Sequence, residues 1–70
     1  MKNKGYEEYF CEGILYAAAL LNRLYDQPSM SAEILREAGI DTWDCSKMEE
    51  FEKKELRIIN KEKGMKLKGL

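Results

Sequence analysis

The first third of the chain has a hydrophobic pattern with the period of an α-helix. Its apolar residues recur at steps of three or four positions, which places them on one side of a helix: Tyr6, Phe10, Ile14, Ala17, Leu21 and Leu24. Acidic and polar residues gather on the opposite side. The alanines and leucines in between are strong helix formers. The pattern predicts a helix over residues 6–26 whose apolar stripe faces a core.

The apolar arc of this helix is wider than one stripe, because a second apolar set lies beside the first. A helix that is apolar on most sides is usually central, with neighbours on more than one face. Alternatively, the second set meets another molecule, since aromatic residues are enriched in the cores of interfaces. We therefore take as the candidate partner surface Tyr9, Leu15, Tyr16 and Leu20. Charged residues interrupt each long apolar run, so no membrane span of about 20 apolar residues is predicted.

A second, shorter helix is predicted over residues 29–38. Ser29 or Ser31 can cap its start, because a serine hydroxyl accepts from an unpaired amide of the first turn. Gly39 fits the left-handed position that ends many helices, with Ile40 folding back onto the last turn. Of the three predicted helices, this one has the most complete set of start and end signals in the sequence.

A third helix is predicted over residues 46–60. The S-x-x-E pattern that begins at Ser46 matches a capping box. The apolar spacing that follows is irregular, because Glu52 and Glu55 fall on the apolar side. A break near residues 53–54, giving two short helices, would remove this conflict.

The basic tail, residues 61–70, supports two interpretations. In the first, which we favour, the third helix ends near Gly64 and an extended tail follows. In the second, Arg57–Asn60 pairs with Met65–Lys68 in a short β-hairpin. Apolar and lysine residues alternate after Gly64, and such alternation is typical of a strand. An isolated hairpin is marginally stable unless it packs on other elements.

These elements predict an all-α fold in a single small domain of 70 residues. We expect a three- to four-helix orthogonal cluster around the long apolar N-terminal helix, with residues 1–5 as a frayed lead. A core of this size supplies only about 3–5 kcal/mol, so good packing or self-association has to stabilise it. The predicted core consists of Phe10, Ile14, Ala17, Leu21, Leu24, Ile34, Leu35, Ile40, Trp43, Phe51, Leu56 and Ile59.

Charge is distributed unevenly along the chain. The net charge is −1, which gives no global basic footprint for nucleic acid. Residues 56–70, however, hold five Lys and Arg against one Glu, while residues 1–55 hold seven against twelve acids. Such asymmetry can mark a tail that contacts an acidic partner. The candidate contacts are Arg57, Lys61, Lys63, Lys66 and Lys68.

Residues for catalysis or metal binding are scarce in this sequence. Histidine is missing, which removes the commonest general base. With two cysteines and no histidine, a structural zinc site cannot be assembled from one chain. No glycine-rich phosphate loop is present. We therefore expect no enzyme activity, cofactor or metal, and the charged start, MKNKGYEE, suggests a cytoplasmic protein with Cys11 and Cys45 reduced.

The leading functional hypothesis is a small intracellular, non-enzymatic protein that binds another protein as an inhibitor or adaptor. Chains of this size and composition are frequent among phage and mobile-element accessory proteins. One alternative is a nucleic-acid-binding regulator that uses the basic tail. Another is a self-associating module, a homodimer held by the first helix.

Overall fold

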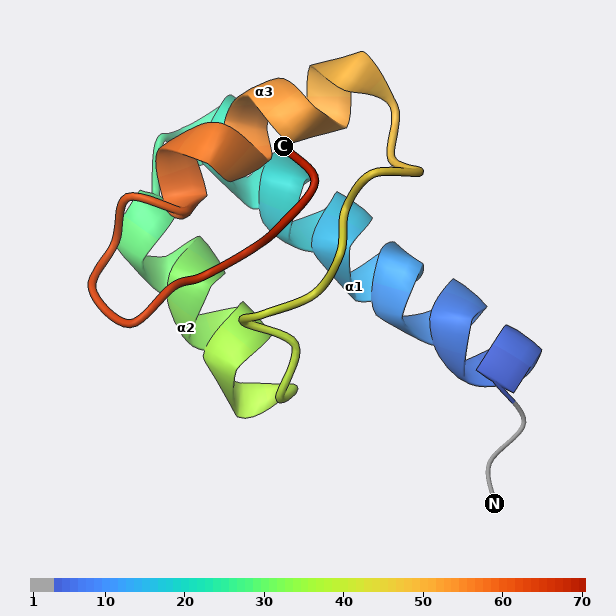
Figure 1. The fold of residues 1–70 in the computed structure, drawn as a ribbon. Helices are drawn as coiled ribbons and strands as arrows, with labels where there is room; N and C mark the ends of the chain where they lie inside the picture. The colour runs from blue at the N-terminus through green and yellow to red at the C-terminus, as the bar shows by residue number, and fades with distance from the viewer. Residues whose placement is uncertain (1–3) are drawn as a thin grey trace.

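Three helices packed together make up the computed structural model, which describes the backbone of residues 4–70 and the side chains of residues 8–70. They are α1 (Lys4–Tyr25), α2 (Pro28–Glu37) and α3 (Glu50–Ile59). Figure 1 shows the C-terminal part of α1 running behind α3 and the tail, with its N-terminal part extending beyond them. Its 22 residues span about 33 Å, close to the longest extent of the molecule, 35 Å. Residues 1–3 of the predicted lead lie outside the described residues, as does the side chain of Tyr6. The prediction of a frayed lead is wrong for Lys4 and Gly5, which belong to α1.

The side of α1 that faces the core differs from the predicted stripe. The buried side consists of Cys11, Leu15, Ala18, Ala19 and Asn22. Of the predicted stripe, Ile14 and Leu21 are half-buried, whereas the prediction is wrong for Phe10, Ala17 and Leu24, which are exposed.

Two long-range hydrogen bonds account for this choice of side. The buried Ser31 hydroxyl of α2 donates to the carbonyl oxygen of Ala18 at 2.9 Å. The Asn22 side chain donates from Nδ2 to Oε1 of Glu55 on α3 at 2.8 Å. Small residues on α1 let the neighbouring helices come close enough for such contacts. Since buried polar groups need partners, these pairs hold the Ala18 and Asn22 side of α1 inward.

Helix α2 ends as the sequence predicts and begins differently. Gly39 has a left-handed φ of 75°, and its N–H donates to the Arg36 carbonyl at 3.0 Å. The N–H of Ile40 donates to the Leu35 carbonyl at 3.0 Å, which completes a Schellman ending. The predicted serine cap is wrong, because Gln27 holds the N-cap position without a side-chain bond.

Helix α3 begins at Glu50 rather than in the predicted box at Ser46. The carboxylate of Glu52 accepts from the backbone N–H of Glu49 at 2.9 Å, so the box lies three residues later than expected. The helix continues through residues 53–54 without a break. Both inward-facing glutamates have hydrogen-bond donors, Glu52 at the helix start and Glu55 through Asn22, so the irregular spacing needs no break.

After α3 the chain turns and returns as an extended tail. Gly64 has a left-handed φ of 85°. Met65 and Leu67 are buried while Lys66 and Lys68 are exposed, so the alternation along the tail matches the strand-like prediction. The predicted hairpin does not form, because Arg57–Ile59 belongs to α3.

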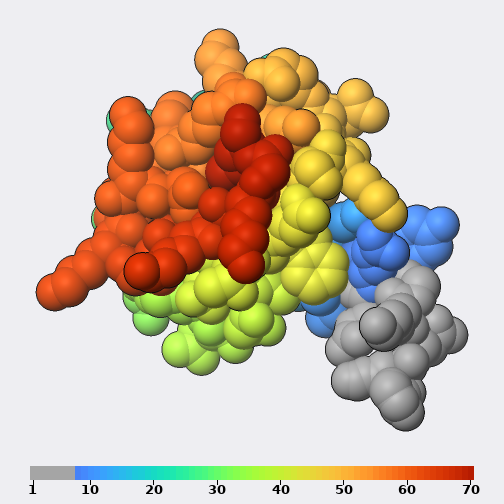
Figure 2. All heavy atoms as spheres, viewed as in Figure 1, coloured from blue at the N-terminus to red at the C-terminus, as the bar shows by residue number. Residues whose placement is uncertain are grey.

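The tail pairs with the connector between α2 and α3, residues 40–49, in parallel orientation. Three backbone hydrogen bonds join the segments: Lys66 N–H to Asp41 O, Lys68 N–H to Trp43 O, and Cys45 N–H to Lys68 O. The Asn60 side chain accepts from the N–H of Leu67 at 2.8 Å and donates to its carbonyl at 3.2 Å. Figure 2 shows the tail filling the space between α3 and the connector. It therefore closes one side of the core.

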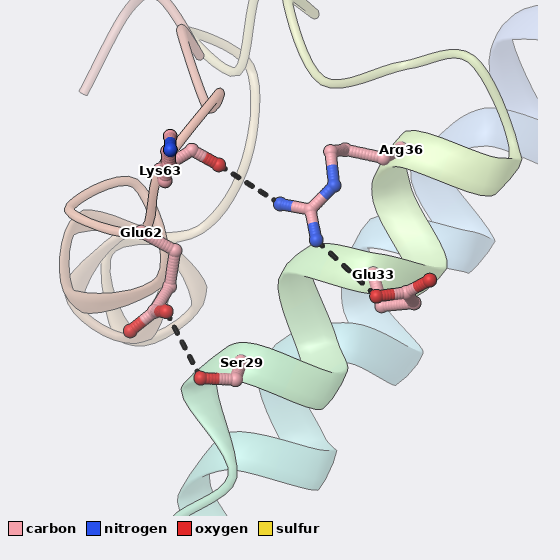
Figure 3. Close-up of polar contacts among 5 residues, drawn as sticks. All are labelled: Ser29, Glu33, Arg36, Glu62 and Lys63. Carbon is pink, nitrogen blue, oxygen red and sulfur yellow. Dashed lines mark hydrogen bonds and ion pairs between the residues drawn. The ribbon is translucent and has the colours of Figure 1, made fainter.

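The turn after α3 is also tied to α2 by side chains, as Figure 3 shows. Ser29 donates from its hydroxyl to Glu62 at 2.9 Å. Arg36 donates to the carbonyl oxygen of Lys63 at 3.0 Å and pairs with Glu33 at 3.3 Å. These exposed contacts position the turn, and through it the start of the tail.

The core agrees with the predicted set only in part. Leu35, Ile40, Leu56 and Ile59 are buried as predicted. Trp43 is partly buried and packs against this core. The prediction is wrong for Ile34 and Phe51, which are exposed. The buried apolar residues missed by the prediction outside α1 are Ala32, Cys45, Met65 and Leu67.

Candidate functional site

The candidate site is the side of α1 turned away from the core. By helical spacing, the positions opposite Leu15 contain no charged residue. Large side chains are strongly exposed there: Tyr9 by 78%, Phe10 by 59% and Leu24 by 60%. We name this surface the α1 outer face and define it as Tyr9, Phe10, Gly13, Tyr16, Ala17, Leu20, Leu21 and Leu24.

Apolar residues of both neighbouring helices continue this surface. On one flank, the rings of Tyr16 and Phe51 meet edge to face, with centroids 6.2 Å apart and an interplanar angle of 89°. On the other flank, Leu21 lines an open hollow with Met30 and Ile34 of α2. Each of these flanking side chains is at least 40% exposed except Leu21, which is half-buried. The apolar surface therefore crosses all three helices.

The sequence located part of this surface. Of the predicted partner residues, Tyr9 and Tyr16 are exposed and Leu20 is half-buried. Leu15 requires a correction, because it has no exposed surface and lies in the core. Phe10 and Leu24 were missed as surface residues because their spacing assigned them to the core. One signal of this exposure was available in the sequence: Phe10 and Leu24 share a side of the helix with two small residues, Gly13 and Ala17.

The predicted basic contacts are distributed along the turn and tail. Lys61, Lys63, Lys66 and Lys68 are exposed. Arg57 differs, because its guanidinium donates to Glu50 at 2.9 Å and to the backbone oxygen of Leu70 at 3.0 Å. That hydrogen bond and charge lower the pKa of Glu50. Arg57 therefore tethers the end of the chain, whereas the lysines face solvent.

Neither cysteine is placed as a nucleophile, since both thiols are buried. Burial, with a smaller contribution from Asp44, raises the pKa of Cys45 to about 11, which opposes formation of the reactive thiolate. The carboxylate of Asp44 accepts from the N–H of Ser46 at 3.0 Å, and this bond lowers its pKa. In the described part of the chain, no cluster of three or more potential metal ligands occurs.

Comparisons with protein-family models, with curated proteins and with solved structures find no match to this chain. Among residues 4–70, none of the helices combines the length and apolarity required to cross a membrane.

Proposed function

We propose that this chain is a small, cytoplasmic, non-enzymatic protein that acts by binding another protein through the α1 outer face. It serves its partner as an inhibitor or adaptor. The observation that supports this function is the set of exposed apolar side chains that extends across α1, α2 and α3.

The size of the exposed apolar surface favours a binding site over a chance exposure of apolar side chains. Four side chains of the α1 outer face, Tyr9, Phe10, Tyr16 and Leu24, are 78%, 59%, 43% and 60% exposed. At about 150–250 Å² for a large side chain, they leave roughly 350–600 Å² of apolar surface in water. Contiguous apolar patches of more than a few hundred Å² mark interaction sites in monomeric proteins. Tyrosine is also enriched among the residues that dominate binding energy.

Binding of nucleic acid by the basic tail is the competing function. Its four lysines face solvent. However, the backbone pairing of the tail with the connector brings Asp41 and Asp44 near these lysines, and Glu62 lies in the turn beside them. Nearby carboxylates repel phosphates and weaken the attraction that counterion release requires. The residues that define the α1 outer face include no charged side chain that would repel a protein partner.

Site-specific photocrosslinking in the organism that encodes the chain distinguishes the two functions. A benzophenone amino acid replaces Leu24 in one variant and the exposed Lys66 in the other, and the products are identified by mass spectrometry. We expect the Leu24 position to capture one predominant protein and the Lys66 position to capture none. Capture at Lys66 alone, or recovery of nucleic acid there, contradicts the proposal and favours the tail.

A further inference from the structure

We infer that a second copy of this chain covers the α1 outer face when no other protein is bound. The two α1 helices pack antiparallel about a two-fold axis near Ala17. This inference rests on the proposed function, because it assigns an occupant to the same surface. Two-fold dimers are the commonest oligomers, and each uses one self-complementary patch twice.

The residue order along the α1 outer face is self-complementary in this arrangement. With Ala17 at the axis, residues whose numbers are equally distant from 17 lie level across the pair. Phe10 of one copy is then level with Leu24 of the other, and Gly13 with Leu21. Large side chains therefore stand opposite small or aliphatic ones, and the small residues at the centre allow the close approach that interdigitating helices require.

The charged residues at one rim of the surface also fit an antiparallel pair. Glu12 and Arg23 lie on the same flank of α1, since eleven positions correspond to about three helical turns. Their midpoint falls between Ala17 and Ala18, half a residue from the axis, so each Arg23 lies nearly level with the Glu12 of the other copy. Neither side chain has an ion-pair partner among the described residues. Antiparallel helices also oppose their dipoles, which favours this orientation.

The available area matches what a small stable dimer needs. A standard interface buries about 800 Å² on each partner. The four large exposed side chains of the α1 outer face, Tyr9, Phe10, Tyr16 and Leu24, contribute roughly half of this area. Exposed Met30 and Ile34 on one flank and Phe51 on the other widen the apolar surface toward that size. A second copy can therefore cover the whole patch without contributions from the tail.

Self-association and capture of another protein are mutually exclusive on this surface. A partner that docks on α1 has to displace the second copy, so its apparent affinity falls as the chain becomes more concentrated. Dimerisation would thus regulate the proposed binding function.

Sedimentation equilibrium of the full chain between 1 and 200 µM tests the inference. We expect the wild-type protein to sediment as a dimer in the upper part of this range. The Ala17→Glu substitution, at an exposed helical position, should give a monomer with unchanged helical circular dichroism. Lys54→Glu, at an exposed position of α3 outside the apolar surface, is the control and should remain dimeric.

A disulfide trap tests the orientation independently of stability. In the antiparallel pair, the two copies of residue 17 meet at the axis, within the roughly 4.4–6.8 Å between Cα atoms that a disulfide spans. Ala17→Cys should therefore form a covalent dimer on mild oxidation, whereas Lys54→Cys should stay monomeric on a denaturing gel. A monomeric wild type at 200 µM, a dimer that survives Ala17→Glu, or equal trapping of both cysteine variants would overturn the inference.

The results also separate this inference from the proposed function. If the wild-type protein is monomeric but position 24 still captures a different protein, the second copy is ruled out and the proposed binding function stands. If the wild-type dimer dissociates on Ala17→Glu and position 24 yields only self-crosslinks, the second copy is supported. The inhibitor or adaptor role is then ruled out.

Discussion

At the scale of single residues, a few polar side chains decide how this chain packs. Ser31 and Asn22 are buried, and each forms a hydrogen bond to another helix. Neither contact can be deduced from the sequence, because each partner lies at least 13 positions away. The sequence shows only that serine and asparagine are polar, which predicts exposure. Their burial selects the inward side of α1 and leaves Phe10 and Leu24 in solvent.

The thiol of Cys45 gives a prediction about reactivity. Burial raises its pKa to about 11, so at pH 8 its thiolate fraction is about 100-fold lower than that of an exposed thiol. We expect iodoacetamide to modify Cys45 at least that much more slowly in the native protein than in urea, as followed by peptide mass spectrometry. The folded state retains the proton that the unfolded state loses, so the free energy of unfolding should fall as pH rises from about 9 to 11. Equal native and denatured rates at pH 8 would contradict this burial.

At the scale of elements, local signals predicted helix ends better than helix starts. The end of α2 follows from Gly39, because few other residues adopt its left-handed conformation at low cost. The start of α3 was misplaced because S-x-x-E at Ser46 and E-x-x-E at Glu49 are both compatible with a capping box. Only the position of the connector against the tail selects the second. The alternation in the tail was visible, but its pairing with the connector was not, since parallel partners are distant in sequence.

The tail can be tested with two glycines that have the same conformation. Gly39 and Gly69 both have φ of 75°. A Cβ at Gly39 would have no neighbour within 4 Å, whereas a Cβ at Gly69 would lie 2.6 Å from the backbone nitrogen of Ser46. Gly39→Ala should cost about 1–2 kcal/mol from the left-handed backbone alone. Gly69→Ala should cost about 1–3 kcal/mol more from overpacking, or should release the tail.

Urea unfolding of the two variants measures this difference, and amide hydrogen exchange at Leu67 reports release of the tail. If Gly69→Ala is no more destabilising than Gly39→Ala and protection at Leu67 is retained, the close packing of the tail against the connector is contradicted.

At the scale of the whole molecule, the class of fold was predictable and the side of α1 that forms its core was not. The spacing of apolar residues correctly indicated a small helical fold. Because α1 carries apolar residues on two opposite sides, spacing alone favoured the side with the larger residues, Phe10 and Leu24. Packing instead favoured the side with Ala18 and Ala19, where α2 and α3 can approach closely. The same reversal leaves a large apolar surface available for binding.

The most direct test of this reversal is an NMR measurement with a soluble nitroxide, which broadens the signals of solvent-accessible methyl groups. In the Ala17→Glu variant, we predict that the methyl signals of Leu24 broaden while those of Leu15 remain sharp. In the concentrated wild-type protein, both residues should be protected, because the second copy covers Leu24. Broadening of Leu15 with protection of Leu24 in the variant would show that α1 packs by the opposite side, and would remove the α1 outer face as a binding surface.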